Sequence, residues 1–235
     1  ALKIRIKFRK YGVLKFIGHL DVMRYFQKAL RRAEVDISFS GGFSPHPIMS
    51  FAAPLGVGLT SDGEYLDIEV NSTDSSKEMV KRLNAVMVEG MEIISYRKLP
   101  DKMKSAMSQV AAADYLLSFR EGYEPQNWSE WVEAWERFLA QPSMVVWKKT
   151  KKSEQEVDIR PMVYQIGLNG RTITMRVATG SAQNLKPEFL MEAFYQFAGM
   201  EWSPFTFQVH RVETYMEGED GFVSLEEAGT VIEMD

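Results

Sequence analysis

The strict alternation of residues 2–9 constrains the fold of this chain more than any other feature. Apolar and basic side chains take turns in the order Leu2-Lys-Ile-Arg-Ile-Lys-Phe-Arg9. Because successive side chains of a strand point to opposite faces of its sheet, the segment is predicted to be a strand with one apolar and one wholly basic face. The sheet that contains it therefore needs one covered face and leaves the other free to meet solvent or a ligand.

Helical and strand patterns alternate along the first hundred residues. After the opening strand, a helix is expected over residues 19–33, where apolar side chains recur at helical spacing with basic side chains opposite them. Further segments follow in the order strand, strand, helix, strand, at 48–51, 65–70, 76–88 and 91–97. The resulting order βαββαβ is that of a ferredoxin-like unit, and RNA-recognition modules use the open sheet face of such units.

The same order recurs after residue 112, although the residues themselves do not repeat. A polar helical connector at 101–112 precedes it, and a two-residue hairpin turn is expected at Asn169-Gly170. The expected segments are strands at 113–119, 144–149, 162–168, 171–177 and 205–215 and helices at 128–139 and 187–197. The sequence therefore predicts an α+β fold of two tandem ferredoxin-like (βαββαβ, RRM-like) units, at 1–100 and 113–215, with an acidic tail at 216–235.

Positive charge is concentrated in the first quarter of the chain. Residues 1–60 hold ten Lys/Arg and three Asp/Glu, a net charge of +7, whereas the whole chain carries −4 and residues 61–235 therefore −11. The last twenty residues contain seven acids and no Lys or Arg, so we expect this tail either to be mobile or to dock on something basic. Such asymmetry in an acidic protein indicates an anionic ligand, with nucleic acid as the first candidate.

Between residues 14 and 70, glycines, prolines and histidines stand in distinctive segments. They read Lys15-Phe-Ile-Gly-His-Leu-Asp21, Ala29-Leu-Arg-Arg-Ala33, Gly42-Phe-Ser-Pro-His-Pro47, Ser50-Phe-Ala-Ala-Pro-Leu-Gly-Val-Gly58 and Glu64-Tyr-Leu-Asp-Ile-Glu69. With these segments the chain resembles the radical SAM-linked protein family, a bacterial domain of unknown function. The resemblance is densest over residues 2–70 and continues more weakly through Lys102–Ser105 and Val157–Pro161. It implies a radical S-adenosylmethionine protein as partner, encoded next to this domain or fused to it, and supplies no established reaction.

The chain contains no cysteine. Radical SAM enzymes hold their iron–sulfur cluster through cysteine thiolates, so any such chemistry belongs to the partner chain. Cysteine-based zinc sites and disulfides are excluded on the same ground, which fits a cytoplasmic protein. No apolar run approaches the roughly 20 residues of a membrane span. We therefore expect no cofactor, no metal site and no membrane association.

The basic strand face and the adjoining helix are the first candidate site. A lysine-rich strand face is often only a solvated surface that discourages aggregation. The neighbouring basic helix and Lys15 favour phosphate binding instead. The expected RNA-binding residues are Arg5, Lys7, Arg9, Lys15, Arg24, Lys28 and Arg31, with Phe43 and Ser44 from the glycine- and proline-rich loop.

Two histidines and one aspartate are the catalytic candidates. Asp21, near the start of the helix with His19, is the kind of residue that satisfies free amides there. His46 stands between Pro45 and Pro47, where it is either a hydrogen-bonded loop residue or a functional group. If His19 and His46 lie together beside the basic face, they can act as general acid and base on a ribose–phosphate group, or join Asp21 around a metal ion. Three ligands without a fixed spacing are too few to predict a metal site.

A secondary basic cluster lies in the second unit. Its residues are Lys148, Lys149, Lys151, Lys152 and Arg160. A lysine-rich hairpin tip is usually only a soluble turn, so this cluster is the weaker RNA candidate. Trp128, Trp131 and Trp135 have the spacing of a buried helix face and are predicted to be packing residues.

These observations favour a non-catalytic, RNA-binding accessory protein. It would present tRNA or ribosomal RNA to a radical SAM enzyme. The first alternative is an RNA-processing or RNA-modifying enzyme, because CRISPR repeat endoribonucleases and pseudouridine synthases also have tandem ferredoxin-like architectures. In that case His19, His46 or Asp21 would be catalytic. The second alternative is an adaptor whose basic surface meets an acidic protein or its own tail.

Overall fold

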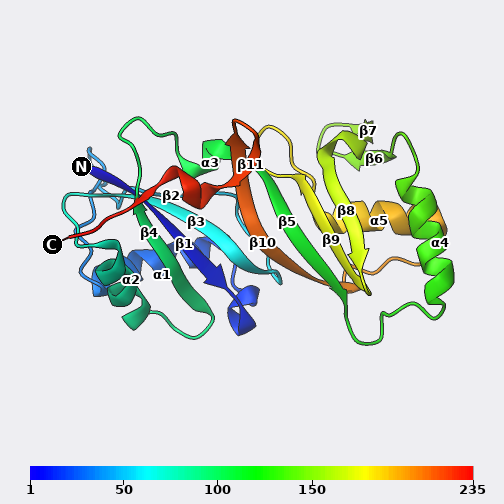
Figure 1. Ribbon diagram of the computed structural model, residues 1–235, viewed down its shortest axis with the longest axis horizontal. Coiled ribbons are helices and arrows are strands. Elements are labelled where there is room, and N and C mark those ends of the chain that lie inside the picture. The colour runs from blue at the N-terminus through cyan, green and yellow to red at the C-terminus, as the bar shows by residue number, and fades with distance from the viewer. Residues whose placement is uncertain (235) are drawn as a thin grey trace. The chain divides into compact units, whose positions relative to one another are not determined.

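The computed structural model describes residues 1–234 and has a mixed α+β fold, with a mostly antiparallel sheet and few helices (Figure 1). The chain divides into two compact units. Unit 1 comprises Ala1–Ala113 and His210–Asp235, and unit 2 comprises Asp114–Val209. The division differs from the sequence-based one because the chain returns to unit 1 at His210, so the last strand and the acidic segment belong with the N-terminal residues.

Unit 1 is built around strand β1, which lies antiparallel between β3 and β4. The short strand β2 pairs antiparallel with β3, β10 pairs parallel with the start of β3, and β12 pairs antiparallel with β4. The elements are β1 (Leu2–Lys10), α1 (His19–Arg32), β2 (Met49–Phe51), β3 (Thr60–Val70), α2 (Ser76–Ala85), β4 (Met91–Lys98), α3 (Ala106–Gln109), most of β10 (Phe207–Gly218), β11 (Gly221–Ser224) and β12 (Thr230–Val231). Two short 3-10 helices span Gly12–Phe16 and Leu225–Ala228.

The core of unit 1 follows from the alternation in β1. Ile4, Ile6 and Phe8 are buried on one face of the sheet, where α1 and α2 cover them (Figure 1). From α1, Phe26 packs on Phe8 with ring centroids 4.7 Å apart. Ser75 caps the N-terminus of α2, because its hydroxyl accepts a hydrogen bond from the amide of Glu78. The expected opening strand and the expected amphipathic helix are both confirmed.

Unit 2 has its core between two helices and a sheet in the order β5-β9-β8, with the first residues of β10 beside β5. Trp131 and Trp135 of α4 are buried, and both rings meet Phe194 of α5. The predicted packing role of these two tryptophans is confirmed. The elements are β5 (Val110–Phe119), α4 (Trp128–Leu139), β6 (Val145–Lys149), β7 (Glu154–Asp158), β8 (Val163–Asn169), β9 (Thr172–Ala178) and α5 (Pro187–Ala198), with a 3-10 helix at Arg160–Met162.

Two local expectations are wrong. The connector at 101–112 is not one helix, because α3 has four residues and β5 already begins at Val110. The tight turn between β8 and β9 is Gly170-Arg171, one residue later than expected, since Asn169 still pairs with Thr172. Gly170 has a φ of 63°, and a positive φ at the first turn position suits glycine.

Most of the acidic segment from residue 216 to residue 231 lies in strands or in the 3-10 helix Leu225–Ala228. It continues β10, forms β11 and then runs to β12, which pairs with Lys98 and Arg97 of β4. The Glu226 carboxylate lies 3.5 Å from the Arg97 guanidinium. Of the two expected outcomes for this tail, the structure therefore has the docked one.

Candidate nucleic-acid interface

The basic face of β1 is covered, which corrects the expectation of an open cationic surface. Arg5 is only 2% exposed. Its guanidinium donates to both oxygens of Asp67, at 2.8 and 3.0 Å, and to the carbonyl of Leu225 at 3.0 Å. Nη2, which also donates to Asp67, reaches the Gln109 side-chain oxygen at 2.7 Å. Arg5 is thus a buried structural cation, and each of its three guanidinium nitrogens donates at least one hydrogen bond.

The next two cations of β1 are also paired with carboxylates. Lys7 Nζ lies 2.6 Å from Glu213, and Arg9 donates to Asp62 at 2.7 Å and to Glu92 at 2.9 Å. Tyr65 joins the ion pair of Lys7 and Glu213, because its hydroxyl donates to Glu213 at 2.7 Å. Burial and the nearby Glu213 charge raise the pKa of the Tyr65 phenol, so this hydroxyl stays protonated. The sequence showed the cations and could not show that acids from distant segments neutralise them.

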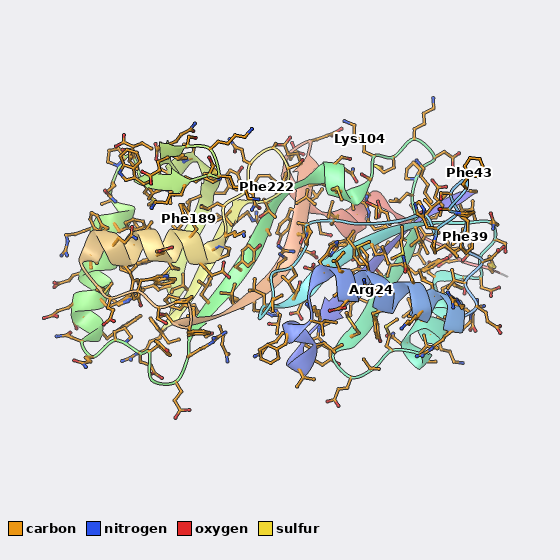
Figure 2. The ribbon with its side chains drawn as sticks, turned by 180° about the vertical axis from the view of Figure 1, so that it is seen from behind. Arg24, Phe39, Phe43, Lys104, Phe189 and Phe222 are labelled. Carbon is orange, nitrogen blue, oxygen red and sulfur yellow. The ribbon has the colours of Figure 1, made fainter. Side chains whose placement is uncertain are left out.

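The outer side of α1 carries the cations that remain exposed. Arg24, Lys28, Arg31 and Arg32 all face solvent, and their spacing places them along one side of the helix. Arg24 lies 3.7 Å from Asp21, in a pair whose side chains are 72% and 64% exposed and which is therefore weak. No carboxylate among residues 1–234 lies within ion-pair distance of Lys28, Arg31 or Arg32. Figure 2 shows Arg24 on this helix.

The loop that follows α1 adds exposed aromatic side chains. Phe43 is fully exposed and Phe39 is more than half exposed, and both lie at the end of the unit in Figure 2. The loop is closed by hydrogen bonds between Ser40 and His46: the Ser40 amide donates to the His46 carbonyl, and Ser40 Oγ lies 3.1 Å from His46 Nδ1. Ser44 is exposed, and its carbonyl lies 3.3 Å from the same ring nitrogen. His46 therefore holds the loop in shape.

His19 occupies a different place. Its ring packs edge-on against Phe51 at 5.3 Å and lines a cavity of about 20 Å³ together with Lys10, Glu64 and Leu55. The cavity is where three of the distinctive segments meet, those containing His19, Phe51 and Glu64. Its volume suits about one water molecule. Lys10 is buried and donates to the Ile17 carbonyl at 2.8 Å, and burial lowers the pKa of its ammonium.

The two histidines are not brought together. The His19 ring contacts Phe51. His46 precedes Phe51 by five residues on a largely extended segment, so the chain from His46 to Phe51 spans about 16 Å at the usual rise of a strand. Asp21 is exposed on the first turn of α1 beside Arg24. Within residues 1–234, no three His, Cys, Asp or Glu side chains are grouped so as to hold a metal ion. A joint acid–base or metal site of His19, Asp21 and His46 is therefore not formed.

The third histidine forms a cluster that sequence reasoning missed. His210 of β10 lies opposite Thr60 of β3, with Thr60 Oγ1 2.7 Å from its Nδ1. Its Nε2 is 2.9 Å from Asp62, which also accepts from Arg9. Burial alone would raise the pKa of Asp62, but the hydrogen bonds from Arg9 and His210 outweigh it and lower that pKa. Thr60 and Asp62 are two residues apart, so a strand places them on the same face, which the sequence can indicate. About 150 residues separate them from His210, so the sequence could not indicate their partner.

Exposed apolar side chains gather where the 3-10 helix Gly12–Phe16 meets α1. Val13, Phe16, Leu20 and Val57 are each more than 60% exposed. The segments are in contact, because the Gly58 amide donates to the Lys15 carbonyl at 2.7 Å. Lys15 itself lies over the Phe16 ring at 5.1 Å. Such a group of exposed apolar residues is typical of a surface that binds another molecule.

The lysine cluster of unit 2 lies on a separate two-stranded sheet formed by β6 and β7. Lys148, Lys149, Lys151 and Lys152 are all exposed, and Lys149 lies 3.3 Å from Glu154. Arg160 follows the hairpin in the 3-10 helix and is partly buried. Sequence reasoning placed these cations correctly on a hairpin and overlooked Trp147, which is 63% exposed beside them.

No helix within residues 1–234 has the length and apolar character needed to cross a membrane. No curated protein matches the sequence. A solved structure of a Cbf5-Nop10-Gar1 complex contains a chain with 10% identity and a TM-score of 0.43, and the match covers 90% of this chain. It covers 48% of that chain, so this protein spans about half its length.

The family comparison covers most of the sequence. Residues 3–187 match the family described as an uncharacterized protein conserved in bacteria, DUF2344. This stretch includes all of the distinctive segments of unit 1 and the greater part of unit 2. The chain therefore belongs to the bacterial family DUF2344.

Proposed function

We propose that this protein is a non-catalytic accessory protein that binds RNA through the outer side of α1 and the loop that follows it. The interface would comprise Arg24, Lys28, Arg31 and Arg32, with Phe43 and Ser44 from the loop. One observation carries the proposal. Arg5, Lys7 and Arg9 of β1 are neutralised by carboxylates, whereas the cations of α1 remain exposed and mostly unpaired.

The chemistry of this surface suits a nucleic acid. Exposed Arg and Lys side chains along one helix can contact successive phosphates, and release of counterions then drives binding. Phe43 offers an aromatic ring to an unpaired base, which is how proteins recognise single-stranded segments of RNA. Because the whole chain has a net charge of −4, binding depends on this local concentration of positive charge.

The fold supports the same proposal at the level of analogy. The strand order β4-β1-β3-β2 of unit 1, with helices after β1 and β3, is what a ferredoxin-like unit would have. We read unit 2 as a second unit of that kind. RNA-recognition modules usually bind RNA on their open sheet face. Here that face is filled by the ion pairs of β1, so the proposed interface is on the helical side.

The proposed partner is a radical SAM protein. This part rests on the resemblance of the distinctive segments and on the absence of cysteine, which leaves cluster chemistry to another chain. The exposed apolar group of Val13, Phe16, Leu20 and Val57 is the surface we assign to that partner. The accessory protein would then hold the RNA while the partner modifies it.

Charge reversal tests the RNA interface. We would measure binding of labelled transfer RNA and labelled single-stranded RNA by fluorescence anisotropy, for the parent and for Lys28→Glu/Arg31→Glu. The matched control is Lys77→Glu/Lys81→Glu, which reverses two exposed cations on α2 of the same unit. Losing two phosphate contacts should weaken binding by roughly ten-fold at physiological salt. Equal affinities for the two double variants would show that α1 is not the interface.

A further inference from the structure

The hairpin of β6 and β7 has an ordered, purely cationic tip. Residues 147–153 contain one tryptophan, four lysines and no acid. The tip is held by short bonds, because the Thr150 amide donates to the Ser153 carbonyl at 2.8 Å and the Ser153 amide donates to Thr150 Oγ1 at 3.1 Å. Lys151 and Lys152 therefore stand at a defined turn.

Trp147 does not serve the core. It is 63% exposed, whereas Trp131 and Trp135 are buried in the same unit. In the hairpin register it pairs with Glu156, and the neighbouring pair Val146 and Val157, on the other face, is the partly buried one. An indole that is 63% exposed contributes little to folding through burial, so its removal is not expected to unfold the hairpin.

The lysines beside Trp147 are available to a ligand. Lys149 has the only carboxylate neighbour that lies within ion-pair distance of these lysines in the described chain, and that pair is highly exposed and weak. By strand alternation Lys148 lies on the face opposite Trp147, whereas Lys149, Glu154 and Glu156 share the face of Trp147. The free cations nearest along the chain are Lys151 and Lys152 at the turn. The exposed ring and the cationic turn together offer the two things that an unpaired nucleotide needs, a stacking partner for the base and a positive charge for its phosphate.

We propose that Trp147 and the lysines around it form a binding site for an unpaired nucleotide of RNA. This inference rests on the proposed function for the identity of the polymer, but its residues lie in unit 2 and are independent of α1. Bases within a duplex are stacked on one another and hide their ring faces. The site therefore selects single-stranded segments, such as loops, over double-stranded RNA.

Substitution of the indole tests the site. We would compare Trp147→Ala and Trp147→Phe, with Tyr123→Ala as a control that removes another exposed aromatic ring of unit 2. The probes are one labelled single-stranded RNA oligonucleotide and its blunt-ended duplex. Trp147→Ala should weaken single-strand binding by about five- to a hundred-fold, the range for loss of one stacked base. Trp147→Phe should restore most of the affinity, and duplex binding should change little.

Three results would overturn the inference. If Trp147→Ala binds single-stranded RNA like the parent while Lys28→Glu/Arg31→Glu loses binding, the hairpin site is contradicted and the α1 interface is supported. Equal weakening for single strand and duplex contradicts selection of unpaired bases. No RNA binding by the parent protein removes both proposals. Far-UV circular dichroism and thermal unfolding of each variant show whether a loss of binding comes from loss of the fold.

Discussion

The buried pair of Arg5 and Asp67 gives the sharpest test of how the basic face of β1 is used. Asp67 accepts two hydrogen bonds from Arg5 and a third, at 2.7 Å, from the amide of Ala106. Asp67→Ala would leave an arginine that is 2% exposed without its counter-charge. Removing one partner of a buried ion pair costs about 3–5 kcal/mol. We therefore expect a loss of stability of about that size.

An exposed pair in the same unit is the matched comparison. Arg24 and Asp21 are 3.7 Å apart and mostly solvated, so Asp21→Ala should change stability by about 0.5 kcal/mol or less. The double substitution Arg5→Met/Asp67→Leu removes both buried charges and should recover part of the loss. Recovery would fall short by about 1–3 kcal/mol, because the Ala106 amide loses its acceptor and the Leu225 carbonyl and the Gln109 side chain lose their donor.

Urea unfolding measures these differences. All five tryptophans lie between residues 128 and 202, so their fluorescence follows unit 2, and far-UV circular dichroism is needed to follow unit 1. The midpoint for Asp67→Ala should fall with little change in slope. If Asp67→Ala costs no more than Asp21→Ala, Arg5 reaches solvent and the face of β1 is open.

Other expected outcomes concern the polar clusters and the loop. The pKa of Asp62 is lowered in the folded state, so the stability that its ionisation contributes is complete above the unfolded pKa of about 3.9 and is lost as the pH falls through the lower folded pKa. Asp62→Asn should remove this part of the acid dependence. Thermal unfolding measured over a range of pH tests it. Gly63→Ala should destabilise unit 1 by about 1–3 kcal/mol, since a Cβ there would stand 2.6 Å from the backbone Cα of Glu213, and an unchanged urea midpoint would contradict this packing. His46→Ala should change stability by no more than about 0.5 kcal/mol because the side chain is exposed, and gel analysis should show no RNA cleavage by either the parent or the variant.

The elements with strong periodicity were predictable from the sequence. The alternation in residues 2–9 and the apolar stripe of residues 19–33 each depend on local spacing, and both segments form as expected. Weak local signals failed, as at residues 101–112, where polar residues suggested a helix and tertiary pairing formed β5 instead. The acidic segment after Met216 has no local preference for β4, so its docking could not be predicted from its composition.

In the candidate site, too, features set by local spacing were predictable and features set by distant contacts were not. The exposed cations of α1 follow from helical spacing, and the sequence located them correctly. Arg5, Lys7 and Arg9 are neutralised in the folded protein by ion pairs. Their partners Asp67, Glu213 and Asp62 come from other strands. Strand alternation says which face a side chain points to and does not say what covers that face. The His210 cluster was hidden for the same reason, since its partners are distant in the chain.

The dependence of RNA affinity on salt concentration tests the central claim most directly. The parent protein should bind single-stranded RNA with a steep negative slope of log affinity against log salt. Lys28→Glu/Arg31→Glu should lower the magnitude of that slope by about 1.4, which is about 0.7 for each lost phosphate contact, while Lys77→Glu/Lys81→Glu keeps the parent slope. A parent protein that binds no RNA at low salt, or an α1 variant with the parent slope, would contradict the account.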